Sequence, residues 1–207
     1  LERLERENTI IEDNVMPIDI RKEAIKEAAL SYGARGGLAW GTYHTRMRLD
    51  KRARYMDRVF DFGQLLVSAP SGLLIEPPVI SESTNAMIIE YGAQEAAVSD
   101  KVYNIITNAQ IVSTPRTWRD YLQRDWGLGE VKPPPDILRP ENDEERELWI
   151  EHVNLGWEQG IIQADEIFED SINLLTADFQ GMVRYRSLLS QGMVSPPYAL
   201  QIDRGVT

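Results

Sequence analysis

The stretch Ser31-Tyr32-Gly33-Ala34-Arg35-Gly36-Gly37-Leu38-Ala39-Trp40 places three glycines inside a segment that has the apolar spacing of a helix. A glycine inside a helix costs about 1 kcal/mol relative to alanine, so another interaction is expected to offset this loss. Gly156 and Gly160 interrupt a second helical pattern in the same way. We therefore predict close packing of two helices at these glycines, because a missing side chain lets another backbone or a large ring approach.

A second interpretation of the glycines is a loop that binds phosphate. The spacing Gly33-Ala34-Arg35-Gly36-Gly37 matches neither the G-x-G-x-x-G motif nor the P-loop, and no strand is predicted before it. Trp40 and Trp157 lie one to two helical turns from the glycines and would fill the grooves that these leave. The packing interpretation is therefore preferred.

Three further patterns define the expected helices. Asp19 is a suitable cap for the first one, in which residues three and four apart form one apolar stripe: Ile20, Ala24, Ala28, Tyr32, Gly36, Trp40, Tyr43 and Met47. A second helix is predicted over 53–67. The longest begins at Asn142, which with Glu145 has the spacing of a capping box, and continues to the glycine stop at Gly192. A break between 171 and 178 remains an open alternative.

The segment 79–112 has the character of strands. Pro77-Pro78 cannot donate ladder hydrogen bonds, so Val79-Ile80 would begin at most an edge strand. The runs 86–91, 101–106 and 109–112 are short and rich in β-branched or aromatic residues, which predicts a small antiparallel sheet. Thr114-Pro115 is a helix-start signal for a short helix to about residue 125.

These elements predict an α+β fold, with long packed helices from the N- and C-terminal parts and the small antiparallel sheet between them. Residues 1–18 are expected to be a flexible N-terminal arm, and residues 19–207 a single domain. At 207 residues the chain is long enough to bury a hydrophobic core, and it contains no apolar run of the length that a membrane-spanning helix needs.

Charge and cysteine content exclude several classes of function. The chain has 33 acidic and 22 basic residues, a net charge of −11, which disfavours a DNA-handling protein. Six basic residues gather in 46–58 and twelve acidic residues in 141–178. These are either solvated faces that attract each other or an oriented docking surface. Because cysteine is absent, disulfides, thiol catalysis and iron–sulfur clusters are excluded for this chain.

No catalytic, cofactor-binding or metal-binding residue is predicted. Neither His44 nor His152 has the neighbours of a metal motif. The carboxylates Asp165, Glu166, Glu169 and Asp170 lack the histidine at i+3 that helical di-metal sites use, and they most simply form a solvated face. A carboxylate pair for glycan hydrolysis is defined in space, so a periplasmic carboxylate-dependent cell-wall glycan hydrolase remains the alternative function.

Three segments are the candidates for binding a partner. Their residues are Pro77, Pro78, Val79 and Ile80, then Trp118, Arg119 and Tyr121, and finally Pro196, Pro197 and Tyr198. Extended arms lose little entropy on binding, and Trp, Tyr and Arg dominate interface hot spots. We expect Trp118 to be a core anchor and Tyr198 to be at an interface, with at least one arm ordered only in a complex.

Several blocks of the chain carry a family resemblance. Two are Leu155-Gly156-Trp157-Glu158-Gln159-Gly160-Ile161 and Thr114-Pro115-Arg116-Thr117-Trp118-Arg119-Asp120-Tyr121-Leu122. The others, in order along the chain, are 28–40, 59–62, 77–80, 163–165, 193–198 and 205–207. In this order they resemble the DotC family, called TraI in the related I-type plasmid transfer systems, over about 20–207. Its members are core components of Dot/Icm-type (type IVB) secretion machines.

The resemblance implies a structural scaffold subunit and no enzyme. It implies a periplasmic lipoprotein at the inner face of the outer membrane, which works with a second small lipoprotein to recruit the ring-forming outer-membrane subunit. No nucleic acid and no cofactor is implied. A lipoprotein needs a lipid-bearing cysteine, and the chain contains none, so we expect the signal and the lipobox ahead of Leu1.

Overall fold

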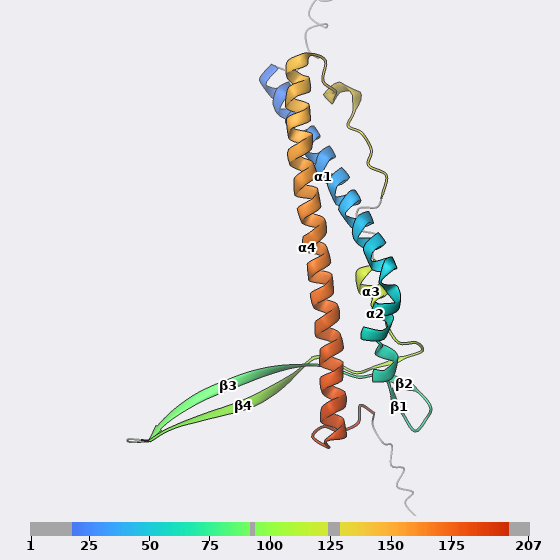
Figure 1. Ribbon diagram of the computed structural model, residues 1–207, viewed down its shortest axis with the longest axis vertical. Coiled ribbons are helices and arrows are strands. Elements are labelled where there is room, and N and C mark those ends of the chain that lie inside the picture. Colours follow the sequence, from blue (N-terminus) through green and yellow to red (C-terminus); the bar gives the residue numbers. More distant parts are fainter. Residues whose placement is uncertain (1–17, 92–93, 124–128, 199–207) are drawn as a thin grey trace, which may run out of the picture. The chain divides into compact units, whose positions relative to one another are not determined.

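The computed structural model describes residues 18–91, 94–123 and 129–198, and it has the predicted α+β fold (Figure 1). The predicted N-terminal arm, except for its last residue, lies outside the described residues. The elements are α1 (Ile18–Lys51), α2 (Ala53–Val59), η1 (Phe62–Leu65), β1 (Val67–Ser68), β2 (Leu74–Glu76), β3 (Val79–Tyr91), β4 (Gln94–Thr107), β5 (Gln110–Val112), α3 (Arg119–Leu122), η2 (Asp136–Leu138) and α4 (Asp143–Ser190).

The chain divides into two compact units. The helical unit consists of Leu1–Arg48 and Asp125–Phe168, and the strand-bearing unit of Leu49–Arg124 and Glu169–Thr207. α4 is a single helix of 48 residues without the break that was left open near residue 171, and its two halves belong to different units. Each unit has its own packing.

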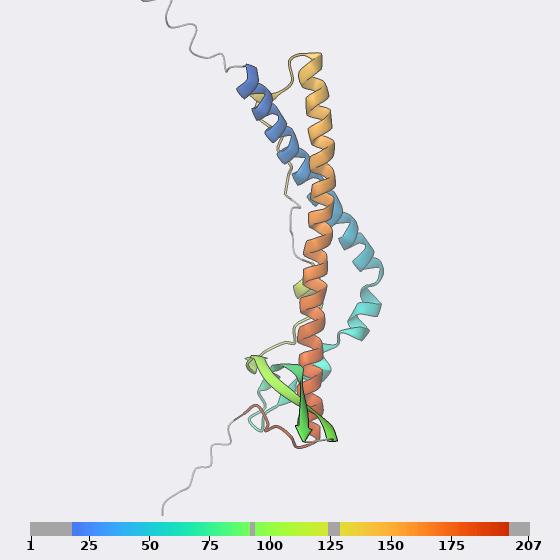
Figure 2. The same ribbon diagram turned by 90° about the vertical axis from the view of Figure 1, so that its left-hand side faces the viewer.

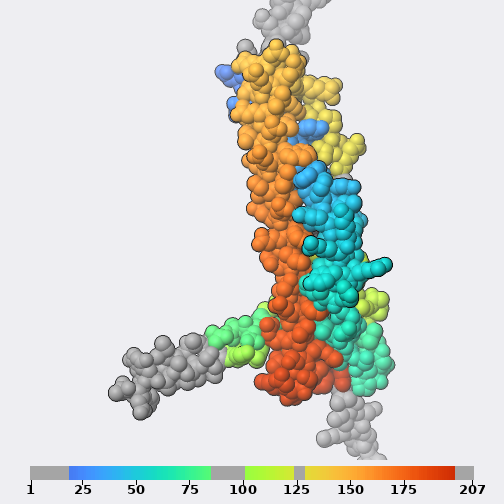
Figure 3. Space-filling model, viewed as in Figure 1, coloured from blue at the N-terminus to red at the C-terminus, as the bar shows by residue number. Residues whose placement is uncertain are grey.

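In the helical unit, α1 and α4 run parallel and side by side (Figures 1 and 2). The direction follows from the contacts, because residue numbers rise together along both helices: Arg21 lies by Glu145, and Gly41 lies by Ala164. Figure 3 shows the two helices in contact along this unit. The predicted packing of the two helices is confirmed.

The glycines mark the places where the two backbones touch. A Cβ atom on Gly33 would lie 2.9 Å from the backbone nitrogen of Trp157, and one on Gly156 would lie 2.9 Å from that of Ala34. Gly37 and Gly160 meet the partner backbone one turn further on in the same reciprocal way. The close approach offsets the cost of the glycines through contacts along both backbones.

The predicted apolar stripe of α1 was placed on the wrong face. The buried residues repeat every four positions, as Ile25, Ala29, Gly33, Gly37, Gly41 and Thr45, whereas Ile20, Trp40, Tyr43 and Met47 of the predicted stripe are exposed. Large apolar residues normally point inward, but helices that touch through their backbones need their smallest residues at the contact. The small residues therefore displace the large ones from the buried face.

Trp157 fills the groove beside the glycines, as expected. A Cβ on Gly36 would lie 3.1 Å from the Trp157 ring rather than against backbone. The ring centroid of Trp40 lies 6.1 Å from that of Trp157, at the edge of the contact. Gly36 therefore faces a side chain, which has more freedom to move than the backbone that Gly33 faces.

The first turn of α4 holds the start of α1 through one buried carboxylate. Asn142 Oδ1 accepts the backbone N–H of Glu145 at 2.9 Å, which confirms the predicted cap. The Glu145 carboxylate reaches back to the backbone N–H of Glu141 at 2.9 Å, and it accepts Arg21 Nε at 2.9 Å. These bonds, first that from Arg21 and then that from Glu141, hold the pKa of Glu145 below its usual value.

The strand-bearing unit contains two antiparallel sheets where one was predicted. β3 and β4 form a two-stranded hairpin, and β5 pairs with β2 in a separate sheet of order β1-β2-β5, in which Ile75 pairs with Ile111. The sequence did not reveal β2. Pro77-Pro78 lies between β2 and β3, and because proline cannot donate ladder hydrogen bonds, the strands on its two sides join different sheets.

Two short helices are shorter than predicted: α2 ends earlier, and α3 begins later and ends earlier. α2 ends at Val59, and the chain continues into η1, where Asp61 accepts the backbone N–H of Gly63 at 3.1 Å. α3 contains only Arg119–Leu122, and Asp120 accepts the backbone N–H of Thr117 at 2.6 Å. In both places a local side-chain bond to the backbone competes with the longer helix that the apolar spacing predicted.

The backbone contact predicts a difference between neighbouring glycines. Gly33→Ala should lower the free energy of unfolding by about 1–3 kcal/mol, because its methyl group meets backbone that has no room to move. Gly36→Ala is the matched control, since it has the same gain in helix propensity but faces only the Trp157 ring. Thermal melting of both variants measures the difference. Equal midpoints would contradict the backbone-contact interpretation.

The first turn of α4 predicts an acid-sensitive contribution to stability. Because the folded-state pKa of Glu145 is lowered, its carboxylate stabilises the fold above the ordinary glutamate pKa of about 4.3, and this contribution is lost as pH falls through the folded value. Glu145→Gln should therefore lose less stability than the parent between about pH 7 and pH 3. Urea unfolding at both pH values measures it, and parallel losses in the two proteins would contradict the assignment.

Candidate partner-binding site

All three predicted partner-binding segments lie in the strand-bearing unit. Pro77, Pro78, Val79 and Ile80 are buried, and the last two pack on α4 at Gly181. A Cβ on Gly181 would lie 3.0 Å from the backbone nitrogen of Ile80, so a glycine again allows a close approach. Ile80 also packs with Tyr185 and Leu188 of α4. This arm is a tightly packed joint rather than a free edge.

Arg116 joins β2, α3 and α4 through four polar contacts. Its guanidinium pairs through two nitrogens with the buried carboxylate of Glu76, with Nε 2.9 Å from Glu76 Oε2, and it donates to Asp178 Oδ2 at 3.0 Å and to the Tyr121 hydroxyl at 2.6 Å. Burial alone would lower the pKa of Arg116, but the hydrogen bonds to Glu76 and Tyr121 outweigh it and raise that pKa. Arg116 therefore stays charged.

Tyr121 connects this polar network to aromatic residues of the core. Its hydroxyl donates to Asp178 at 2.7 Å, and its ring stacks on Phe62 with centroids 6.0 Å apart. Burial, opposed by the hydrogen bond from Arg116, raises the pKa of Tyr121, so the phenol remains neutral. Phe179 of α4 meets the Phe62 ring edge-on at 5.2 Å. The predicted aromatic element is thus built into the core.

Trp118 is only 1% exposed, which agrees with its expected role as a core anchor. Its indole Nε1 donates to Asp57 at 2.7 Å, and Arg119 donates to the same carboxylate oxygen at 2.6 Å. These two bonds, that of Arg119 foremost, lower the pKa of Asp57. The Arg119 guanidinium also lies over the Trp118 ring, 4.3 Å from its centroid.

The third segment borders an open groove. The Tyr185 hydroxyl donates to the backbone oxygen of Ser195 at 2.8 Å and directs the chain after α4 toward the small sheet. The groove there has a volume of about 590 Å³, and it is lined by Ala69, Pro70, Ser71, Leu73, Ile75, Ala109, Gln110, Ile111, Pro197 and Tyr198. Pro196 is exposed, and Tyr198 is half-buried. We call this feature the edge groove, because β5 is an edge strand of its sheet.

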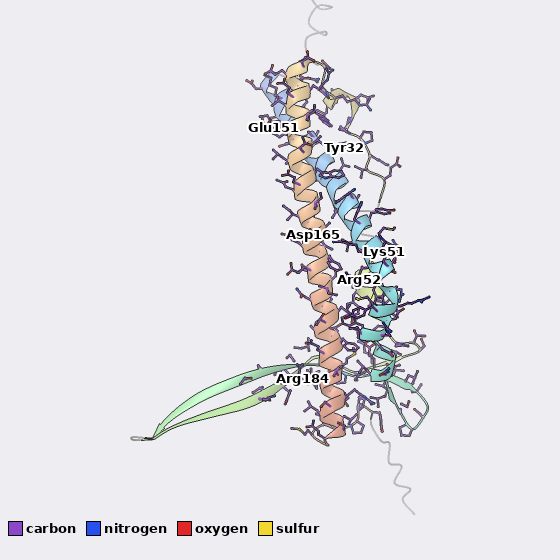
Figure 4. The ribbon with its side chains drawn as sticks, viewed as in Figure 1. Tyr32, Lys51, Arg52, Glu151, Asp165 and Arg184 are labelled. Atoms are coloured by element: carbon purple, nitrogen blue, oxygen red, sulfur yellow. The ribbon has the colours of Figure 1, made fainter. Side chains whose placement is uncertain are left out.

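A second groove, of about 770 Å³, lies between α4 and the base of the hairpin. Glu82 on its wall pairs with Lys101 at 2.9 Å and with Arg184 at 3.3 Å, and the first of these contacts contributes most to lowering the pKa of Glu82. Arg184, labelled in Figure 4, also donates to the backbone oxygen of Ile80 at 2.5 Å. No motif in the sequence marks these residues, because each is a lone charge in an ordinary pattern.

The predicted partner-binding residues do not form one site. Tyr121 joins the network of Arg116, which the sequence analysis did not predict, while Pro197 and Tyr198 lie at the edge groove. The partner-binding role of these residues stays a prediction. Within the described residues, no group of histidines and carboxylates could hold a metal ion. Nor is any described helix long and apolar enough to cross a membrane.

The strand-bearing unit thus combines a polar network around Arg116, the edge strand β5 and two open grooves. A family model described as "Type IV secretory system, conjugal DNA-protein transfer" matches residues 19–207. The chain therefore belongs to the TraI/DotC family of type IV secretion and conjugation proteins. Among curated proteins, no match to the chain is found.

The burial of Trp118 predicts a large effect on folding. Trp118→Ala should cost about 3–5 kcal/mol of folding stability, because it leaves a cavity in the core. Trp118→Phe is the control, since it keeps a six-membered ring in the core and should cost less than Trp118→Ala. It loses the hydrogen bond to Asp57, at about 0.5–1.5 kcal/mol, and part of the indole packing. Thermal and urea unfolding measure both. Normal folding of Trp118→Ala with weakened partner binding would instead identify Trp118 as a hot spot.

Proposed function

We propose that this protein is a structural scaffold subunit of the outer-membrane core complex of a type IV secretion or conjugation system. In this role it recruits the ring-forming subunit and holds it at the outer membrane, together with a second small lipoprotein. The observation that carries the proposal is the edge groove, an apolar surface beside an unpaired strand edge in a chain of the TraI/DotC family.

The edge groove has the chemistry for β-strand addition. β5 uses one edge to pair with β2 and stands at the end of its sheet, so its other edge offers backbone donors and acceptors. Ile111 of β5 is 69% exposed, and Leu73 beside it is exposed as well. An extended segment of the ring-forming subunit would pair with β5 through its backbone and place apolar side chains against Ile111 and Tyr198.

The hairpin offers a second surface for the same assembly. Among the described residues, β3 (13 residues) and β4 (14 residues) form a two-stranded sheet, and two-stranded hairpins are marginal by themselves in water. Ile105 and Ile106 of β4 are both exposed. A partner that covers these side chains would stabilise the hairpin, so we assign it to the complex as well.

Anchoring and chemistry complete the proposal. A lipid-bearing cysteine ahead of Leu1 would hold the protein at the periplasmic face of the outer membrane.

No catalytic step is assigned, and this distinguishes the proposal from the glycan-hydrolase alternative. Asp165, Glu166, Glu169 and Asp170 are exposed on α4, and neither groove described above is lined by them. Exposed carboxylates outside these grooves support a solvated face more than a hydrolytic pair.

A substitution in the edge groove tests the proposal. Ile111→Asp should reduce co-purification of the ring-forming subunit from cells by about tenfold or more, because a charge would enter an apolar contact. Ile137→Asp is the matched control, since Ile137 is 61% exposed but lies in the helical unit. Equal co-purification by both variants, with unchanged melting, would overturn docking at the edge groove.

A further inference from the structure

The helical unit carries an apolar patch on the outer side of α1. Its residues are Tyr43 and Met47, both exposed. Trp40 is not part of it, because its ring lies 6.1 Å from that of Trp157 on α4. At about 100° per residue, Tyr43 and Met47 each lie about 200° around the helix from the buried residue two positions before them, Gly41 and Thr45. The patch therefore faces away from α4. We call it the α1 patch.

α4 carries a second apolar patch on its own outer side. Leu155 and Ile162 are exposed and one heptad apart, and at about 100° per residue they lie about 140° and 200° around the helix from Gly160, which contacts α1. We call these two residues the α4 patch.

The charged residues near the two patches have opposite sign. From Ala28 to Leu49 the sequence of α1 has three arginines and no acidic residue. From Glu147 to Val183 the sequence of α4 has eight acidic residues and no lysine or arginine. Exposed carboxylates border the α4 patch directly: Glu151, Glu158, Asp165 and Glu166, of which Figure 4 labels the first and third. The apolar surfaces are therefore complementary in electrostatic potential.

From this complementarity we infer that the helical unit associates with a second copy of itself, the α1 patch of one copy packing on the α4 patch of the next. The contact is heterologous, because the two patches are different surfaces on different helices. Repetition of such a contact builds a closed ring when the rotation closes and an open filament when it does not. Tyr43, which is 53% exposed, and Ile162, which is 57% exposed, would be central residues of the two patches.

Light scattering and sedimentation of the 207-residue chain over a range of concentrations test the inference. The parent chain should self-associate, and the association should weaken as salt is raised, because the charges are exposed. Tyr43→Glu and Ile162→Lys should each raise the Kd of self-association by about tenfold or more. Leu155→Lys serves as a second α4-patch variant, and circular dichroism checks that each variant is folded.

Mixing the two variants gives the decisive result. Tyr43→Glu keeps an intact α4 patch and Ile162→Lys an intact α1 patch, so an equimolar mixture should form one-to-one dimers and nothing larger. A parent chain that stays monomeric, or folded single variants that associate like the parent, would overturn the inference. A mixture that fails to dimerise would also overturn the inference, because it would show that the α1 patch and the α4 patch do not bind each other. Co-purification of the ring-forming subunit is a separate measurement, because it is expected to depend on Ile111 in the edge groove and not on either patch.

Discussion

The contact between two helix backbones at Gly33, Gly37, Gly156 and Gly160 is the constraint on which the helical unit depends. Glycine is needed at these four positions, because even one methyl group there would meet a carbonyl or an amide of the other helix. The approach also fixes the register, since each glycine faces a defined peptide on its partner. The same device recurs at Gly181, where α4 meets the backbone of Ile80.

The choice of glycine over larger apolar residues has a second consequence. In an ordinary helix pair, residues such as Trp40, Tyr43 and Met47 would fill the interface, and the outer faces would be polar. Here the glycines occupy the interface, so these large residues stay on the outside. Tight internal packing and an exposed apolar surface are thus two results of one sequence choice.

The sequence predicted what depends on local pattern or on a single residue type. The two long helices, the cap at Asn142 and the packing role of the glycines follow from periodicity and from the cost of glycine. The buried face of α1 could not be predicted from the spacing of large apolar residues, because that rule assumes side-chain packing. β2 was missed because it has only three residues, and its pairing with β5 depends on partners 34 to 38 residues further along the chain.

The candidate site was predictable only in part, for a related reason. Trp118 and Tyr121 are recognisable as aromatic anchors, and burial of both agrees with that interpretation. The residue that connects them to the rest of the unit is Arg116, which pairs with Glu76 and Asp178 across 40 and 62 positions. Arg116 is partly buried, but its partner Glu76 is buried, and removing the cation from a buried carboxylate is strongly destabilising. Glu76 is the last residue of β2, so the network holds the strand with which β5 pairs. Under the proposed strand addition, a partner strand would therefore meet a preformed edge and lose little affinity to its ordering.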